Sequence, residues 1–203
     1  MNKKPFKFYV KKAMSAVVYL LITLITGIVG ISFSNDLLVL KIILGIMNIG
    51  LYAYFVFYMN YKTGEESMSV RFANDINRME IIKTGKDIPL KTTEEFKWWK
   101  GFFIGLLSSV PLLVLWIIHF VLVLITGSQT SIIGGITISL YVFIVYFFNL
   151  KSEGLASSSS FYFTSLYVPF VVILSGVGYL IGGRKALNYH HGFEEMNKEI
   201  YGE

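Results

Sequence analysis

The chain has 203 residues, of which 54% are hydrophobic and 15% are charged, and its mean hydropathy is +0.60. An average soluble domain carries roughly 25% charged residues, so this composition argues against an ordinary soluble globular protein. Cysteine is absent, which excludes disulfides, thiolate metal sites and cysteine nucleophiles. The net charge of +5 does not imply nucleic acid as a partner, because lysine and arginine gather in the cytoplasmic loops of membrane proteins.

The chain opens with the basic and aromatic stretch MNKKPFKFYVKK. Lysines attract anionic lipid headgroups and aromatic rings favour the membrane interface, so we expect this stretch to lie against the inner leaflet. The uncharged residues 13–33 that follow are about as long as one bilayer crossing. A signal peptide has a shorter apolar core that ends at a cleavage site, so an uncleaved first membrane helix is predicted.

A second apolar segment, residues 37–59, follows a polar turn and ends in a run of tyrosines. Tyrosines suit the aromatic belt at a membrane interface, which predicts a second span. Lys41 lies about one turn inside this segment, and Asn48 lies near its middle. We interpret Lys41 as a lysine that extends toward the nearby interface, and an ion pathway is the alternative.

Residues 60–100 form the polar loop of the predicted fold, on the cytoplasmic side. Apolar residues recur there in steps of three and four, which predicts an amphipathic helix with Gly85 as its stop. The functional interpretation of this stripe is a docking helix for a partner or an in-plane membrane anchor, and the alternative is a cover over the helices of the same chain. Its members are Met68, Phe72, Ile76 and Met79.

The end of this loop leads into the third apolar segment, residues 101–126. Thr92 and Glu95 have the spacing of a capping box, in which a threonine and a glutamate satisfy the first amide groups of a helix. Trp98 and Trp99 follow directly and are predicted to anchor the helix at the membrane interface.

Residues 101–150 contain no Asp, Glu, Lys or Arg, and one histidine, His119. A stretch of this length predicts two membrane helices, residues 101–126 and 132–149. A histidine inside a membrane suggests a proton carrier or a ligand. Because no intramembrane carboxylate could complete a relay, we interpret His119 as a neutral histidine that is either hydrogen-bonded to a neighbouring helix or near the outer end of a long tilted span.

A fifth apolar segment, residues 161–182, is rich in glycine. Two glycine pairs have the spacing that lets helix backbones approach closely, Gly101 with Gly105 and Gly178 with Gly182. We predict that these pairs pack helices within the molecule, with self-association as the alternative.

The C-terminal tail, residues 183–203, contains two pairs that could seat a metal on one helix face, His190 with Glu194 and His191 with Glu195. Gly192 interrupts the turn and no third ligand is evident, so no metal and no cofactor are predicted.

The basic residues favour a cytoplasmic amino terminus. Arg184 and Lys185, directly after the last predicted span, also resemble an interior stop, and an odd number of spans cannot place both ends inside. Either the tail lies outside or one apolar segment is re-entrant.

The predicted fold is therefore an all-α, polytopic bundle of about five transmembrane helices in a bacterial plasma membrane. The chain has no Walker A, HExxH or GxSxG motif and no pair of membrane carboxylates, so we predict that it is not an enzyme. The favoured function is a non-catalytic accessory or scaffold subunit, whose partners are the lipid bilayer and either a membrane protein or a second copy. The alternatives are a small permease or channel that uses His119 and Lys41, and a metal-dependent protein that uses the tail histidines.

Overall fold

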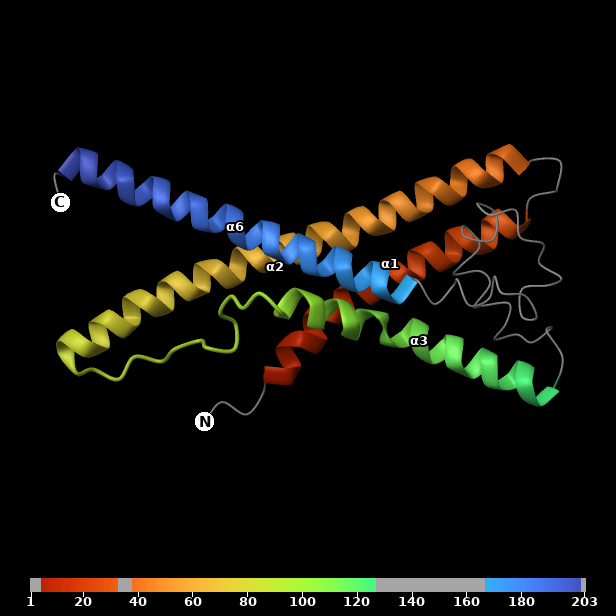
Figure 1. The fold of residues 1–203 in the computed structure, drawn as a ribbon, viewed down its shortest axis with the longest axis horizontal. Helices are drawn as coiled ribbons and strands as arrows, with labels where there is room; N and C mark the ends of the chain where they lie inside the picture. Colours follow the sequence, from red (N-terminus) through yellow and green to blue (C-terminus); the bar gives the residue numbers. More distant parts are fainter. Residues whose placement is uncertain (1–4, 33–37, 127–166, 202–203) are drawn as a thin grey trace.

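The computed structural model describes residues 5–32, 38–126 and 167–201, and within them the chain is all α-helical apart from the connection between two of the helices. The helices are α1 (Pro5–Ser32), α2 (Leu38–Thr84), α3 (Lys100–Thr126) and α6 (Tyr167–Tyr201). Helix α6 packs against α2 and α3, and α1 packs against the same two helices from another side. The helices meet near the centre of the molecule and diverge toward its two ends (Figure 1).

Helix α2 is a single helix of 47 residues, which corresponds to about 70 Å at the usual rise per residue. It continues through the positions where the second span was predicted to end, so the predicted amphipathic segment is its second half. The helix does end where predicted. Gly85 follows it with a φ of 68°, a conformation that glycine adopts without steric cost, and its amide donates to the Ile81 carbonyl at 2.8 Å.

Helix α6 also runs past its predicted end. It contains 35 residues, so the predicted fifth span and most of the predicted tail form one helix that passes through Gly182 and Gly183. Both glycines are buried against neighbouring helices, which favours a continuous helix over a turn at this point. The segment 132–149, predicted as the fourth span, lies outside the described residues.

The prediction of about five transmembrane helices is wrong. Among the residues that the structure describes, one helical segment is long and apolar enough to cross a membrane, Val168–Gly192, and it is partly buried by other helices. The helical bundle itself is confirmed. Hydropathy also misplaced two of the predicted span ends, because backbone hydrogen bonding carries α2 and α6 on into their charged segments.

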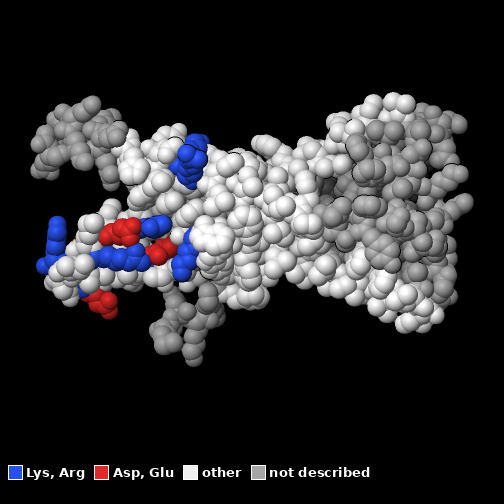
Figure 2. Space-filling model, in the orientation of Figure 1, with Lys and Arg blue, Asp and Glu red and all other residues white. Residues whose placement is uncertain are grey.

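The protein core lies where the helices cross. A cluster of Tyr9, Ala13 and Ile104 joins α1 to α3, while Val56 and Val171 are fully buried on α2 and α6. Charged side chains gather at the end of the molecule that holds the second half of α2, and the described surface of the opposite end is uncharged on the face seen in Figure 2. The crossing thus separates a charged end from an apolar end.

Candidate functional site

The central feature is a close helix crossing that is built on glycine. We define the crossing as residues 61–64 of α2, 101–105 of α3 and 175–183 of α6. A Cβ atom on Gly182 would overlap the Tyr61 carbonyl oxygen, and one on Gly178 would lie 2.6 Å from that of Phe57. Real Cβ atoms essentially never come this close, so the backbones of α2 and α6 touch directly.

Helix α3 makes the same kind of contact on another side of α6. A Cβ on Gly105 would lie 2.8 Å from the Cβ of Ser175, and one on Gly101 would overlap the side chain of Tyr179. The structure therefore places one predicted glycine pair at the α3–α6 contact, and the other, Gly178 with Gly182, at the α2–α6 contact. Tyr179 is fully buried between the helices, where its ring stacks on Phe96 with the ring centroids 4.9 Å apart.

Polar contacts surround this crossing on the charged side. Lys12 of α1 forms an ion pair with Glu66 of α2 at 2.6 Å. Glu65 accepts a hydrogen bond from Lys62 at 2.8 Å, which holds the pKa of the Glu65 carboxyl below its ordinary value. Lys185 of α6 approaches the same carboxylate at 3.5 Å. The pairs of Lys12 and Lys185 fix the register of α2 against α1 and α6, and they add little stability because exposed ion pairs are individually weak.

The connection between α2 and α3, residues 85–99, runs back along the second half of α2 (Figure 1). We call it the return loop. Its Phe96 amide donates to the Ser67 carbonyl at 2.9 Å, and its Lys91 amide donates to the Asn74 side chain at 3.1 Å. The loop is therefore fixed to α2 through its backbone.

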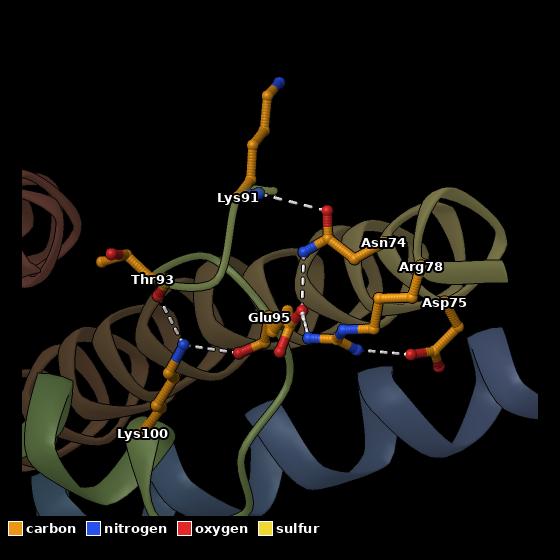
Figure 3. Close-up of polar contacts among 7 residues, drawn as sticks. All are labelled: Asn74, Asp75, Arg78, Lys91, Thr93, Glu95 and Lys100. Atoms are coloured by element: carbon orange, nitrogen blue, oxygen red, sulfur yellow. Dashed lines mark hydrogen bonds and ion pairs between the residues drawn. The ribbon is translucent and has the colours of Figure 1, made fainter. Parts of the chain in front are cut away.

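Glu95 is the centre of this attachment (Figure 3). One of its carboxylate oxygens accepts hydrogen bonds from Asn74, at 2.7 Å, and from Arg78. Arg78 also pairs with Asp75 on the preceding turn of α2. The predicted capping box is therefore wrong, because α3 begins at Lys100 and the Glu95 carboxylate binds α2 instead of the start of α3.

Lys100 completes the attachment from the α3 side. Its side chain is 1% exposed, and its ammonium group donates to the carbonyl oxygens of Thr93 and Glu95 (Figure 3). The same group lies 5.9 Å from the ring centroids of Phe8 and Tyr9 on α1. Burial lowers the pKa of Lys100 from 10.5 to about 8, and the neighbouring charge of Lys97 acts in the same direction. A neutral amine still has two N–H groups for the two carbonyls.

The predicted docking stripe on α2 is divided by the structure. Met68 is buried and Phe72 contacts the ring of His190 on α6, with centroids 3.8 Å apart. Ile76 and Met79 lie nearer the end of the helix and are 65% and 63% exposed. The α2 face thus packs on α6 close to the crossing and is open beyond it.

The remaining predicted residues are distributed over the molecule. Trp98 and Trp99 are exposed at the start of α3. Asn48 is partly buried on α2, and the side chains of Lys41 and His119 lie outside the described part. His191 is exposed, and the side chains of Glu194 and Glu195 are likewise not among those described. Within the described side chains, no three histidine or carboxylate groups lie close enough together to hold a metal ion. The permease and metal hypotheses stay predictions.

Sequence reasoning missed the contacts that fix the return loop. Asn74 and Arg78 are polar residues on a helix face that carries no recognisable motif, and no spacing in the sequence links them to Glu95. One local signal was available, because Asp75 and Arg78 have the three-residue separation of an intrahelical ion pair.

The chain matches no protein-family model, no curated protein and no solved structure.

Proposed function

We propose that this protein is a non-catalytic accessory or scaffold subunit that is embedded in a membrane by its apolar end. Its charged end, formed by the second half of α2, the return loop and the second half of α6, then faces water and carries the surface on which a partner protein docks.

The observation that carries the proposal is the apolar surface of one end of the molecule. Large apolar side chains on the outer half of α1, the first half of α2 and nearly all of α3 are exposed. A soluble monomer seldom exposes a large contiguous apolar surface, and lipid chains cover such a surface at no hydrophobic cost. The members on α2 and α3 are Val39, Leu40, Ile43, Leu44, Ile46, Met47, Leu51, Leu106, Val110, Leu113, Val114, Ile117, Ile118, Val121, Leu124 and Ile125.

Aromatic side chains at the boundary of the two ends support the same orientation. Tyr54 and Tyr58 stack on α2 with centroids 5.8 Å apart, just before the charged residues begin, and both are exposed. Trp98 is 68% exposed just before the apolar part of α3. Tyrosine and tryptophan prefer the level of the lipid headgroups, because one edge of each ring is polar and the rest is apolar.

The scaffold part of the proposal is supported by the far end of α2. Ile76, Met79 and Ile82 are all more than half exposed there, on a helix that carries charged residues of both signs around them. An exposed apolar stripe on a helix is the surface that a second helix or an apolar groove recognises. We therefore place the partner on this stripe.

The test is gentle detergent extraction of the tagged full-length protein from its native membrane, followed by the mass of the assembly and identification of bound chains. We expect the protein in the membrane fraction, and in an assembly larger than the monomer. The double substitution Ile76→Ser with Met79→Ser should release the partner without removing the protein from the membrane.

Arg71→Ser with Glu80→Ser, at exposed positions of the same helix, is the matched control and should retain the partner. Recovery of the protein in the soluble fraction would contradict the membrane part of the proposal. A monomer in the extracted wild type, or a partner that both double variants retain equally, would contradict the scaffold part.

A further inference from the structure

The start of α1 and the start of α3 lie together at the edge of the apolar end. The ring of Tyr9 lies 6.0 Å from that of Trp99 and 5.2 Å from that of Phe103, measured between centroids. The Lys100 ammonium group lies between these elements, near the rings of Phe8 and Tyr9. Residues 97–99 of the return loop are therefore neighbours of the first turns of α1.

Three exposed lysines lie two residues along the chain from Tyr9 or Trp99, Lys7 and Lys11 on α1 and Lys97 on the loop. We call them the basic rim. Among the ion pairs that the structure describes, none includes a lysine of the rim, whereas Lys12 is paired with Glu66. Lys97 also adds its positive charge beside the buried Lys100. Positive charges that pair with no carboxylate in the described part of the chain favour an anion as their counter-charge.

The position of the rim specifies which anion can reach it. On α1, Phe6 is exposed just before the rim, and the exposed apolar side chains resume at Met14 and Val18 directly after it. On α3 the exposed apolar side chains begin at Leu106, nine residues after Lys97 and eight after the exposed Trp98. If the apolar end lies in lipid, as proposed above, then the rim lies at the level of the headgroups.

We propose that the basic rim binds the phosphate groups of anionic phospholipids, with Trp98 beside it at the headgroup level. A lysine near an anionic membrane surface is attracted to it, and three lysines at the level of the headgroups favour an anionic lipid over a zwitterionic one. The inference rests on the proposed membrane location, and it adds the chemical class of lipid that this location selects.

Tryptophan fluorescence tests the proposal directly. The chain has three tryptophans, so Trp116→Phe leaves Trp98 and Trp99 as the reporters beside the rim. The full-length protein is placed in vesicles of equal amounts of phosphatidylcholine and phosphatidylglycerol, with brominated acyl chains on one lipid or on the other. We expect brominated phosphatidylglycerol to quench about twofold more than brominated phosphatidylcholine, and added salt to reduce the difference.

The triple substitution Lys7→Gln, Lys11→Gln and Lys97→Gln should make the two lipids quench nearly equally. The matched control removes three other exposed lysines of the charged end, Lys83, Lys86 and Lys91, and should keep the difference.

Equal quenching of the unsubstituted rim by both lipids, or a preference that survives in the triple variant, overturns the proposal. In that case the counter-charge of the rim would be an acidic protein surface instead of a lipid, and the proposed membrane location would be unaffected. An absence of quenching by either lipid would instead contradict the membrane location itself, so the two failures are distinguishable.

Discussion

Helix α2 is held by its neighbours in two different ways. At the crossing, its backbone touches α6 directly at Gly178 and Gly182, and no side chain separates the two helices. Along its second half, the return loop is attached through long polar side chains, chiefly Glu95 and Arg78. The contact at the crossing requires glycines without a side chain, and the attachment of the return loop requires the particular side chains that form its hydrogen bonds. Any substitution disturbs the glycine contact, whereas the polar attachment fails only when a bonding group is lost.

The largest expected effect comes from Gly182→Ala. The added methyl group would overlap the Tyr61 carbonyl, so α6 must move away from α2, and we expect a loss of about 3 kcal/mol or more in the free energy of unfolding. Gly50→Ala is the control, because nothing lies within 4 Å of its Cβ position, and it should stabilise α2 by about 0.5 to 1 kcal/mol. Denaturant unfolding of the detergent-solubilised protein measures both. Equal stability of the two variants would show that the crossing tolerates a side chain.

A smaller loss is expected from Glu95→Ala at the return loop. The substitution leaves Asn74 and Arg78 without their shared acceptor, and we expect a cost of about 2 kcal/mol. Glu80→Ala removes an exposed carboxylate from α2 and should change stability by less than about 0.5 kcal/mol. The same unfolding measurement applies. If Glu95→Ala costs no more than Glu80→Ala, then the polar attachment contributes nothing to the fold.

The smallest expected effect is the pH dependence that Lys100 introduces. Its pKa is about 8 in the folded protein and 10.5 as an ordinary lysine, so between these values the unfolded chain binds more protons than the folded one. Stability should therefore rise with pH across this window, by about 1 to 2 kcal/mol after allowance for solvent screening. Lys100→Gln should lose this rise, and the exposed Lys86→Gln should keep it. Parallel pH profiles of wild type and Lys100→Gln would refute the assignment.

The apolar parts of the helices could be predicted from the sequence, and the continuation of α2 and α6 beyond their apolar parts could not. Residues 13–32, 38–59 and 101–126 are helical as expected, since apolar runs of this length form helices from local preferences. The polar residues after position 59 did not stop α2, because they are satisfied inside the helix. Asn60 donates to the Val56 carbonyl at 2.8 Å, and Thr63 donates to that of Met59 at 2.9 Å.

The stop at Gly85 was predictable and the role of Glu95 was not, because the first depends on local backbone geometry and the second on distant residues. The stop at Gly85 was predictable because the required backbone conformation belongs to glycine itself. The role of Glu95 was not, because the threonine three residues before it gives a convincing local motif, while its actual partners lie 17 and 21 residues away on α2. The ends of α2 and α6 were misplaced because hydropathy describes a segment alone, without the packing that its helix makes further along the chain.

The unbroken length of α2 has a mechanical consequence. The crossing at Gly64 divides this helix into parts of 26 and 20 residues, or about 39 Å and 30 Å. A straight rod that is held near its middle behaves as a lever with nearly equal arms. If a partner displaced the Thr84 end by a few ångströms, a rigid α2 would swing the Leu38 end by a similar distance in the opposite direction. The motion would then pass from the charged end to the apolar end without any change in secondary structure.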